Sequence, residues 1–283
     1  MIKKILVTGG VGFIGSNLIK ELIRHGHMLI SLDNYSTGSK KNEIDGVKYI
    51  NDDISNINKL DDNFDLCFHL AAQSRVQPSF SNPEESLRVN VNGTSSVMEW
   101  ARKNNIKVVY AGSSSRHHDP SDSPYAMYKF LGEEVCKLYR KSFNLKVEIA
   151  RFYNVYGPGE NIDEKYGNVI GIWKSKVLKG EPLPIVGNGE QKRDFIHVDD
   201  IVDGLIKISL SSIEHKDAWE LGTGVNYSVN ELFNLFKERF GVQSINIPNQ
   251  SGNYPETLRI NNDMLDLLKW IPKDRLKQHI NSF

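Results

Sequence analysis

Short apolar runs alternate with longer amphipathic segments along the first half of the chain. The runs have the length of buried strands: KKILVTG, MLISLDN, FDLCFHLAA, KVVYAGSSS and KVEIARFYN. The segments between them place apolar residues at helical spacing, as in SNLIKELIRHG and SPYAMYKFLGEEVCKLYRKSFN. Such alternation is typical of a parallel sheet covered by helices on both faces. We therefore predict an α/β fold with a Rossmann-type doubly wound parallel sheet.

The regular pattern loosens after Asn154, where Gly, Pro and Asn become frequent. We predict that residues 1–154 form the Rossmann domain, and that residues 155–190 and 223–283 form a smaller α/β C-terminal lobe for the substrate. The strand-like AWELG at residues 218–222 is expected to return to the first sheet. Residues of about 191–222 are therefore assigned to the first domain, so that the lobes interleave along the chain.

The composition narrows the possible partners. Lys plus Arg number 35 and Asp plus Glu number 35, so no net charge attracts nucleic acid or an anionic membrane. No apolar run approaches the roughly 18 residues needed to span a bilayer, and Gly9 and Gly10 interrupt the opening MIKKILV. Cys67 and Cys136 form no CxxC pair, which favours packing roles over a disulfide or a metal site. We expect a cytoplasmic protein without a metal.

A glycine-rich turn follows the first apolar run. It reads TGGVGFIG from Thr8 to Gly15 and contains both GxxGxxG from Gly9 and GxGxxG from Gly10. A turn of this kind between a strand and a helix lets backbone amides at the helix N-terminus face a diphosphate. The turn predicts a dinucleotide site, with these contacts: Gly9, Gly12, Phe13, Ile14 and Gly15.

Asp33 ends the next apolar run, 18 residues after Gly15. A carboxylate at this place accepts hydrogen bonds from the adenosine ribose hydroxyls and repels a 2′-phosphate. Asp33 therefore favours NAD over NADP. The alternative is an ordinary turn at a strand end, since Asp33 and Asn34 form a sequence that suits turns.

Tyr125 and Lys129 stand four residues apart in a helix-like segment and therefore share one helix face. A lysine ammonium beside a phenol lowers the pKa of the phenol, so we expect Tyr125 to act as a base near neutral pH. Tyr and Lys at this spacing also occur in helices with no catalytic role. Upstream, the run KVVYA leads into hydroxyl side chains, among them Ser113, at a strand end of the same sheet.

Together these motifs, with HLAAQ, NVNGT and RDFIHVDD, resemble the extended short-chain dehydrogenases/reductases of the NAD-dependent epimerase/dehydratase family. The resemblance covers nearly the whole chain and is strongest with sugar nucleotide epimerases similar to UDP-glucose 4-epimerase. It implies that Ser113, Tyr125 and Lys129 are catalytic. Tyr125, and not Tyr128, fits the YxxxK spacing.

The resemblance also implies further contacts on both ligands. Asp53 and Ile54 would lie at the adenine, Ala71 and Ala72 along the diphosphate, and Asn90 near the nicotinamide. The implied cofactor contacts beyond the glycine turn are Asp33, Asn34, Asp53, Ile54, Leu70, Ala71, Ala72, Asn90, Tyr125, Lys129 and Tyr153. The implied substrate contacts are Ser113, Ser114, Tyr125, Asn154 and Arg193. Strand-end or turn roles are the alternative for these residues.

Arg193 resembles the family arginine that meets the nucleotide diphosphate, and its alternative is a surface ion pair with Asp194. Two features depart from the family pattern. Only 12 residues separate Ser113 from Tyr125, where the family has a longer loop. A second diphosphate-binding arginine is replaced by Gln250, which should weaken diphosphate binding unless another cation, such as Arg259, takes its place.

The implied reaction is NAD-dependent epimerisation of a nucleoside diphosphate sugar, most plausibly at C4 of a UDP-hexose. A reductase of the same family stays open as an alternative. A 4,6-dehydratase is disfavoured, because Ser114 and Ser115 stand where family dehydratases carry an Asp-Glu pair. A non-catalytic NAD-binding regulatory module is the alternative of another class.

Two further expectations concern the loop after Ser115 and the assembly. Adjacent residues point apart, so His117 and His118 are predicted to lie in a solvated loop and not to bind a metal jointly. Family members commonly pair through two helices, which here fall near residues 84–104 and 124–142. The resemblance thus implies a homodimer.

Overall fold

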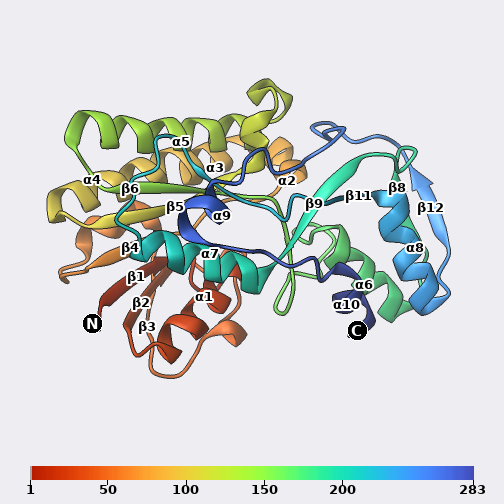
Figure 1. The fold of residues 1–283 in the computed structure, drawn as a ribbon, viewed down its shortest axis with the longest axis horizontal. Coiled ribbons are helices and arrows are strands. Elements are labelled where there is room, and N and C mark those ends of the chain that lie inside the picture. Colours follow the sequence, from red (N-terminus) through yellow and green to blue (C-terminus); the bar gives the residue numbers. More distant parts are fainter. Residues whose placement is uncertain (1) are drawn as a thin grey trace.

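Seven parallel strands form the central sheet of the computed structural model, which describes residues 2–283 (Figure 1). The strands are β1 (Lys4–Thr8), β2 (Met28–Asp33), β3 (Lys48–Asn51), β4 (Leu66–His69), β5 (Lys107–Ser113), β6 (Val147–Phe152) and β10 (Trp219–Leu221). Their order is β10-β6-β5-β4-β1-β2-β3. The order reverses at β1, and ligands of doubly wound sheets bind at the carboxyl ends beside such a reversal. The predicted fold class is confirmed.

Helices cover both faces of this sheet (Figure 1). One face carries α1 (Phe13–Arg24), α7 (Val198–Leu210) and α9 (Asp263–Leu268). The other carries α2 (Val76–Ser81), α3 (Pro83–Leu87), α4 (Thr94–Asn104) and α5 (Pro124–Phe143), with a π-helical segment at Arg88–Gly93 between α3 and α4. Short 3₁₀ turns lie at Lys40–Asn42, Ile54–Lys59, Ser114–His117 and Pro120–Asp122.

Each face of the sheet has its own hydrophobic core. Leu18 of α1, Ile201 of α7 and Trp219 of β10 belong to the first core. Val97 and Trp100 of α4 belong to the second. Both cysteines are buried and unpaired in the described part of the chain, as the sequence predicted. Because the two faces are closed by helices, the carboxyl edge of the sheet is the part left to form a site.

A smaller lobe stands beside the carboxyl edge of the sheet (Figure 1). Its helices are α6 (Val169–Lys179), α8 (Val229–Phe240) and α10 (Leu276–Asn281). Its strands are β7 (Asn154–Tyr156), β8 (Leu183–Val186), β9 (Lys192–His197), β11 (Asn226–Ser228) and β12 (Ser244–Ile247), which form the sheets β11-β9-β7 and β12-β8. A third core fills this lobe, with Trp173, Phe195 and Phe236 among its buried residues.

The chain crosses between the lobes at places that differ in part from the prediction. β10 pairs with β6 in the central sheet, where the sequence placed it. β9, within the range 191–222, pairs instead with β7 and β11 of the small lobe. Met264 and Trp270, within the range 223–283, pack in the first core. The apolar pattern marks these elements as buried but does not say against which sheet they pack.

The start of α5 is fixed by its own sequence. The Ser123 hydroxyl accepts a hydrogen bond from the Ala126 amide at 3.1 Å, and Pro124 occupies the first helical turn. This cap sets Tyr125 and Lys129 in the first turns of α5. The cap therefore places both side chains toward the carboxyl end of β5.

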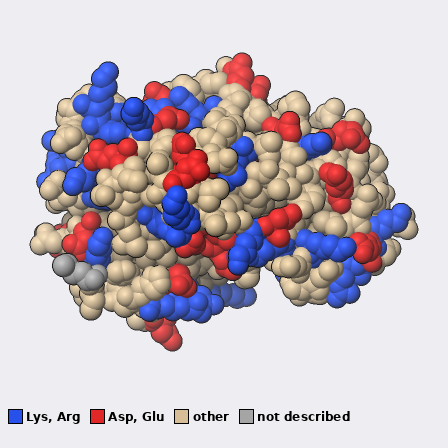
Figure 2. All heavy atoms as spheres, in the orientation of Figure 1, with Lys and Arg blue, Asp and Glu red and all other residues tan. Residues whose placement is uncertain are grey.

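Basic and acidic side chains are interspersed on the face of the molecule drawn in Figure 2. Such a surface agrees with the equal numbers of basic and acidic residues in the sequence. Among the helices of residues 2–283, none combines the length and hydrophobicity needed to cross a bilayer. The described residues also include no cluster of three or more His, Cys, Asp or Glu side chains arranged to hold a metal ion.

Candidate active site

A cavity of about 1430 Å³ runs along the carboxyl edge of the sheet and under the small lobe. Its walls include Gly9 after β1, Asp33 at the end of β2, Ala71 after β4 and Ser113 at the end of β5. Pockets for one small molecule are usually about 300–1,000 Å³. This cavity is therefore large enough for two ligands side by side.

The glycine turn brings the backbone close to neighbouring strands and leaves the start of α1 open. A Cβ on Gly9 would lie 2.8 Å from the Ala71 nitrogen, and one on Gly15 would lie 2.2 Å from the Gly9 oxygen. At Gly12, the only atom within 4 Å of such a Cβ would be the Gly9 oxygen, at 3.2 Å. No side chain caps α1. Its first amides are thus available to a diphosphate, as an NAD site requires.

Asp33 lies beside this turn, and its side chain is nearly buried. Its carboxylate accepts hydrogen bonds from the Val11 amide at 3.1 Å and the Tyr35 amide at 2.8 Å. Burial raises the pKa of Asp33, and these two amides oppose the rise. Each carboxylate oxygen keeps a further lone pair for a hydroxyl. The residues present therefore fit the adenosine ribose of NAD.

Most of the other predicted cofactor residues also line the cavity. They are Phe13, Ile14, Asn34, Asp53, Ile54, Leu70, Ala72, Tyr125, Lys129 and Tyr153. Asp53 already accepts two hydrogen bonds from the Arg88 guanidinium, at 3.0 and 3.1 Å. The Arg88 guanidinium holds the pKa of Asp53 well below its usual range. Asp53 thus stays ionised at the end of the cavity where the resemblance implies the adenine.

Asn90 differs from the other predicted cofactor residues, because it is buried and does not line the cavity. Its amide oxygen accepts from the Gln73 backbone nitrogen at 2.8 Å, and its amide nitrogen donates to the Gln73 oxygen at 2.9 Å. Gln73 does line the cavity. Asn90 therefore acts on the site by holding the backbone of Gln73.

The three predicted catalytic residues converge at the end of β5. The Tyr125 hydroxyl donates to the Ser113 Oγ at 3.2 Å, and the Ser115 hydroxyl donates to the same atom at 2.9 Å. The Lys129 ammonium donates to the Ala111 carbonyl and lies 4.6 Å from the centre of the Tyr110 ring. A phenol, a hydroxyl and an ammonium thus meet on one wall of the cavity.

Burial governs the protonation of this group. It raises the pKa of Tyr125, and the Ser113 hydrogen bond and the Arg75 charge only reduce the rise. It also lowers the pKa of Lys129 to about 8, against the opposing effect of the Glu133 carboxylate. The expectation that Lys129 lowers the pKa of the Tyr125 phenol is therefore wrong for the protein without its ligands. Lys129 donates to the Ala111 carbonyl, and burial outweighs the remaining charges.

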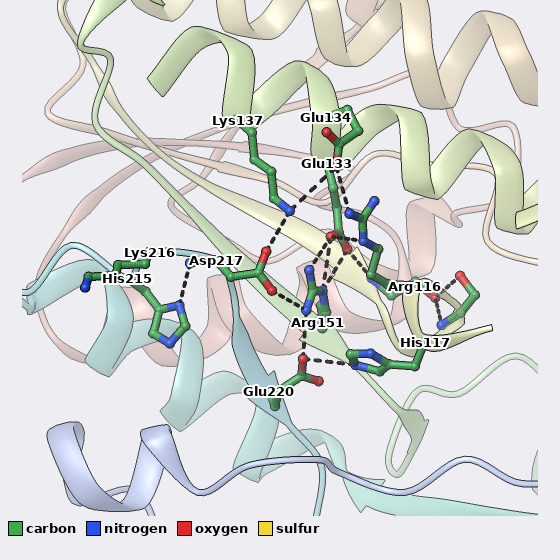
Figure 3. A network of polar contacts seen from close by, with 12 residues as sticks. Arg116, His117, Glu133, Glu134, Lys137, Arg151, His215, Lys216, Asp217 and Glu220 are labelled. Atoms are coloured by element: carbon green, nitrogen blue, oxygen red, sulfur yellow. Dashed lines mark hydrogen bonds and ion pairs between the residues drawn. The ribbon is translucent and has the colours of Figure 1, made fainter. Parts of the chain in front are cut away.

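A buried charge cluster lies next to the end of β5 (Figure 3). Arg151 of β6 contacts Glu133 of α5 at 2.8 Å and Glu220 of β10 at 3.0 Å, and the three side chains are at most 3% exposed. Glu133 also accepts from the Ser113 amide at 3.4 Å. Tyr153 donates its hydroxyl to Glu220 at 2.9 Å. The cluster thereby joins α5, β5, β6 and β10 directly beneath the cavity.

Both histidines of the short loop after Ser115 contact other parts of the chain. The prediction that they lie in a solvated loop is therefore wrong. His117 lies 3.0 Å from a Glu220 carboxylate oxygen (Figure 3). The His118 ring stacks on Tyr254 with centroids 3.9 Å apart. Arg116 lies over the Phe130 ring at 3.9 Å. The side chains of this loop therefore contact β10, α5 and the second lobe.

The second lobe contributes Arg193 to the cavity, together with Asn154, while Ser114 lines the opposite wall. Arg193 does not pair with Asp194, which is buried and accepts from the Thr223 amide at 2.8 Å and the Gly224 amide at 2.9 Å. Arg193 donates instead to Asn253 and to the Lys192 carbonyl. The alternative of a surface ion pair is therefore wrong, and the guanidinium keeps free donors.

Arg259 does not replace the missing arginine at Gln250. Its side chain packs on Gly222 and Gly224, and a Cβ on Gly224 would lie 2.8 Å from an Arg259 guanidinium nitrogen. Arg259 does not line the cavity, whereas Gln250 does. Arg259 is therefore not placed to contact a ligand in this cavity.

Three residues of the site were not identified from the sequence. Arg75 and Glu160 line the cavity, and Glu133 anchors the charge cluster. Glu133 could have been found, because it stands four residues after Lys129 on the same helix face. Arg75 follows HLAAQS just beyond a strand end, which is a weak signal. Nothing in the sequence around Glu160 indicates its place on the wall.

Replacing Asp33 tests the cofactor site. Asp33→Ser removes a carboxylate that accepts ribose hydroxyls, so we expect NAD affinity to fall about 10- to 100-fold. Discrimination against NADP should fall with it, because the repulsion of a 2′-phosphate is lost. The measurement is cofactor titration by protein fluorescence, with the exposed Asp45→Ser as the control. Unchanged preference for NAD in Asp33→Ser would contradict this role.

Replacing Lys129 tests the effect of burial on its charge. The pKa of Lys129 is lowered to about 8 in the folded protein, so the unfolded state binds more protons between about pH 8 and 10.5. Below about pH 8 Lys129 is charged in the folded protein, and burial of this charge lowers the free energy of unfolding by the full amount. Above about pH 8 the folded protein loses this proton, so the destabilisation decreases. Lys129→Met should raise the free energy of unfolding at pH 7 by about 1–3 kcal/mol, a gain that shrinks toward pH 10.

Urea unfolding at several pH values measures this effect. Lys141→Met, at an exposed lysine of the same helix, is the matched control and should change the stability little at any pH. A gain in Lys129→Met that is the same at pH 7 and pH 10, or a loss at pH 7, would refute the burial argument.

Comparison with known proteins places this geometry in a family. Residues 5–222 match the NAD dependent epimerase/dehydratase family. A putative UDP-glucose 4-epimerase of Methanocaldococcus jannaschii is 36% identical over an alignment of 298 positions. The alignment covers 98% of this chain and 95% of the relative.

Solved structures agree with that placement. A UDP-glucose 4-epimerase of Thermotoga maritima, determined with UDP-glucose, superposes with a TM-score of 0.90 at 28% identity and covers 98% of this chain and 96% of its own. An epimerase of Methanothermobacter thermautotrophicus superposes with a TM-score of 0.92 at 29% identity, over 99% and 90% of the two chains. These matches confirm the predicted enzyme class and the predicted cofactor, NAD. The chain belongs to the NAD-dependent epimerase/dehydratase family.

Proposed function

We propose that this protein interconverts the epimers at C4 of a UDP-hexose or a derivative of one, with NAD. The observation that carries the proposal is the convergence of Tyr125, Ser113 and Lys129 on the wall of the cavity that also holds the glycine turn and Asp33. A proton-transfer group and a dinucleotide site therefore share one cavity. The similarity to UDP-glucose 4-epimerases supports the choice of reaction.

The catalytic wall can move a proton at the sugar hydroxyl. NAD, when bound beside it, supplies a carbon that accepts a hydride and gives it back. The Tyr125 oxygen takes the proton from the C4 hydroxyl of the sugar as the C4–H bond breaks. It returns the proton to that oxygen when the C4–H bond forms again on the other face of the sugar. The Ser113 hydroxyl holds the same sugar oxygen. The positive charge of the Lys129 ammonium offsets part of the negative charge on the Tyr125 oxygen during this transfer.

The nucleotide diphosphate is assigned to the second-lobe wall. Arg193 is half-buried there, forms no ion pair in residues 2–283 and has donors left for phosphate oxygens. Burial lowers its pKa to about 10, so it stays charged at neutral pH. Asn154 donates its amide to the Asp194 carbonyl at 3.2 Å and to the Thr257 hydroxyl at 3.1 Å, which leaves its oxygen to accept from the substrate.

The same wall disfavours the dehydratase alternative. Elimination of water across two carbons needs an acid and a base besides the tyrosine. Ser114 and Ser115 are buried at those positions, and Ser115 donates to Ser113. Neither serine can transfer a proton in this way near pH 7. Reduction of a sugar ketone, the other alternative, would use the same three residues.

The homodimer and the cytoplasmic location stay predictions. For the dimer we propose the outer faces of α4 and α5, where Leu138 is 53% and Phe143 is 50% exposed. Val97 and Trp100, in contrast, are buried in the second core and cannot contact a second copy. Only some of the apolar residues on the two helices are therefore available for pairing with a second copy.

Replacing Tyr125 tests the proposed reaction. The NAD-loaded protein is offered UDP-glucose, UDP-galactose and their N-acetyl and uronate forms, and products are separated by chromatography. We expect interconversion of at least one pair without accumulation of NADH. Tyr125→Phe should lower turnover about 100- to 10,000-fold, because the proton-transfer group is lost, and should leave NAD binding intact.

Tyr128→Phe is the matched control, three residues along the same helix, and should keep nearly full activity. Activity of Tyr125→Phe equal to the unmodified protein would remove the phenol from the mechanism. If all of these sugar nucleotides return unchanged while NAD stays bound, the proposed function is wrong.

A further inference from the structure

Arg75 is a cation on the cavity wall that the reaction described above does not use. Its Nε donates to the Tyr166 carbonyl at 2.7 Å, and it forms no ion pair within residues 2–283. A guanidinium carries five N–H donors, and leaving most of them without a partner in a half-buried place is unfavourable. The arrangement favours an anionic ligand that completes these hydrogen bonds.

The position of Arg75 is fixed from both sides of the cavity. It directly precedes α2, whose Ser79 hydroxyl accepts from the Tyr125 amide at 3.0 Å. Its own side chain reaches Tyr166, in the segment before α6 of the second lobe. Arg75 therefore spans the cavity close to the start of α5. Its positive charge acts on the Tyr125 phenol and reduces the burial-induced rise of the pKa of Tyr125.

Arg75 and Arg193 stand at different parts of the cavity. Arg193 donates to Asn253 and to the Lys192 carbonyl, whereas Arg75 donates to the Tyr166 carbonyl. The groups that act on Arg75 are Tyr125 and Glu160. Glu160 forms no ion pair with Arg75 and contacts His279 at 3.2 Å instead. The two guanidinium groups are therefore held by different segments of the cavity wall, and the charge of Arg75 acts on Tyr125.

Sugar geometry indicates what Arg75 can reach. In a hexose ring, C4 lies across the ring from C1, which bears the diphosphate, and next to C5, which bears C6. With C4 at Tyr125, the neighbouring ring positions are C3 and C5, and of these only C5 bears a carbon, C6, that can be an anionic carboxylate. A hydroxymethyl group there would leave the guanidinium without an ion pair among residues 2–283. A carboxylate would accept two parallel hydrogen bonds from it.

We propose that Arg75 recognises a carboxylate on C5 of the sugar, so that the preferred substrates are nucleoside diphosphate hexuronic acids. This inference rests on the proposed function, because it takes C4 to lie at Tyr125. It assigns Arg75 a role in specificity, and it leaves the proton transfer to Tyr125.

Binding and turnover of UDP-glucuronate and UDP-glucose test the proposal with the NAD-loaded protein. Titration calorimetry gives the two Kd values, and product analysis gives the two kcat/KM values. The unmodified protein should prefer UDP-glucuronate by at least about tenfold in both. Arg75→Gln should reduce affinity for UDP-glucuronate about 10- to 100-fold and change that for UDP-glucose by less than about threefold.

Two further variants separate direct contact from other effects. Arg75→Lys keeps the charge and should restore part of the preference. Lys165→Gln removes a positive charge from the exposed edge of the same cavity and should change the preference less than about threefold. Retained NAD and an unchanged melting temperature show that Arg75→Gln is folded.

The outcomes distinguish this inference from the proposed function. Conversion of neutral UDP-hexoses with equal or better kcat/KM than uronates would overturn the role of Arg75 and leave the epimerase proposal standing. Equal loss of both substrates in Arg75→Gln, or an equal effect of Lys165→Gln, would also overturn it. If nothing is converted, the proposed function is wrong, and the two Kd values still decide whether Arg75 selects a carboxylate.

Discussion

The buried contact of Arg151 with Glu133 and Glu220 is the interaction on which the site depends. It joins the helix that carries Tyr125 and Lys129 to the strand that returns from the second half of the chain. Breaking one partner of a buried ion pair typically costs about 3–5 kcal/mol, because the remaining charge stays buried. The Glu133 carboxylate also offsets part of the cost of burying the Lys129 charge. Lys129 therefore interacts with the charge cluster as well as lining the cavity.

The cluster also explains why the short loop after Ser115 has a fixed position beside the cavity. His117 and Tyr153 both contact Glu220, and the Ser113 amide contacts Glu133. The loop is thus fixed by the same carboxylates that hold the sheet and α5 together. Ser113 and Tyr153, which line the cavity, are held by Glu133 and Glu220 and do not depend on a longer loop for their positions.

Much of the fold and of the cofactor site followed from the sequence. The alternation of apolar runs gave the sheet, the glycine spacing placed the open start of α1, and the YxxxK spacing placed Tyr125 and Lys129 on one helix face. These features depend on local geometry, which a sequence encodes directly. The return of β10 to the first sheet followed from its strand-like pattern.

What the sequence did not yield depends on contacts between distant segments. The pKa of Tyr125 is raised because elements from several parts of the chain bury it. His118 is held by Tyr254 of the other lobe, so the histidines looked solvated in the sequence. The place of Arg75 on the cavity wall depends on its hydrogen bond to the distant Tyr166 carbonyl and on the absence of an ion pair in residues 2–283. Neither can be predicted from the sequence around Arg75. β9 could be recognised as buried, but its sheet could not.

The central claim is that the cavity holds a sugar whose C4 hydrogen leaves as hydride and returns to the same carbon. The most direct measurement follows deuterium placed at C4 of a UDP-sugar that the protein converts, with the product examined by NMR spectroscopy and mass spectrometry. The account predicts an inverted C4 that keeps its deuterium, with no label in the solvent and no accumulation of reduced cofactor. Loss of the label to water, or inversion at another carbon, would contradict it.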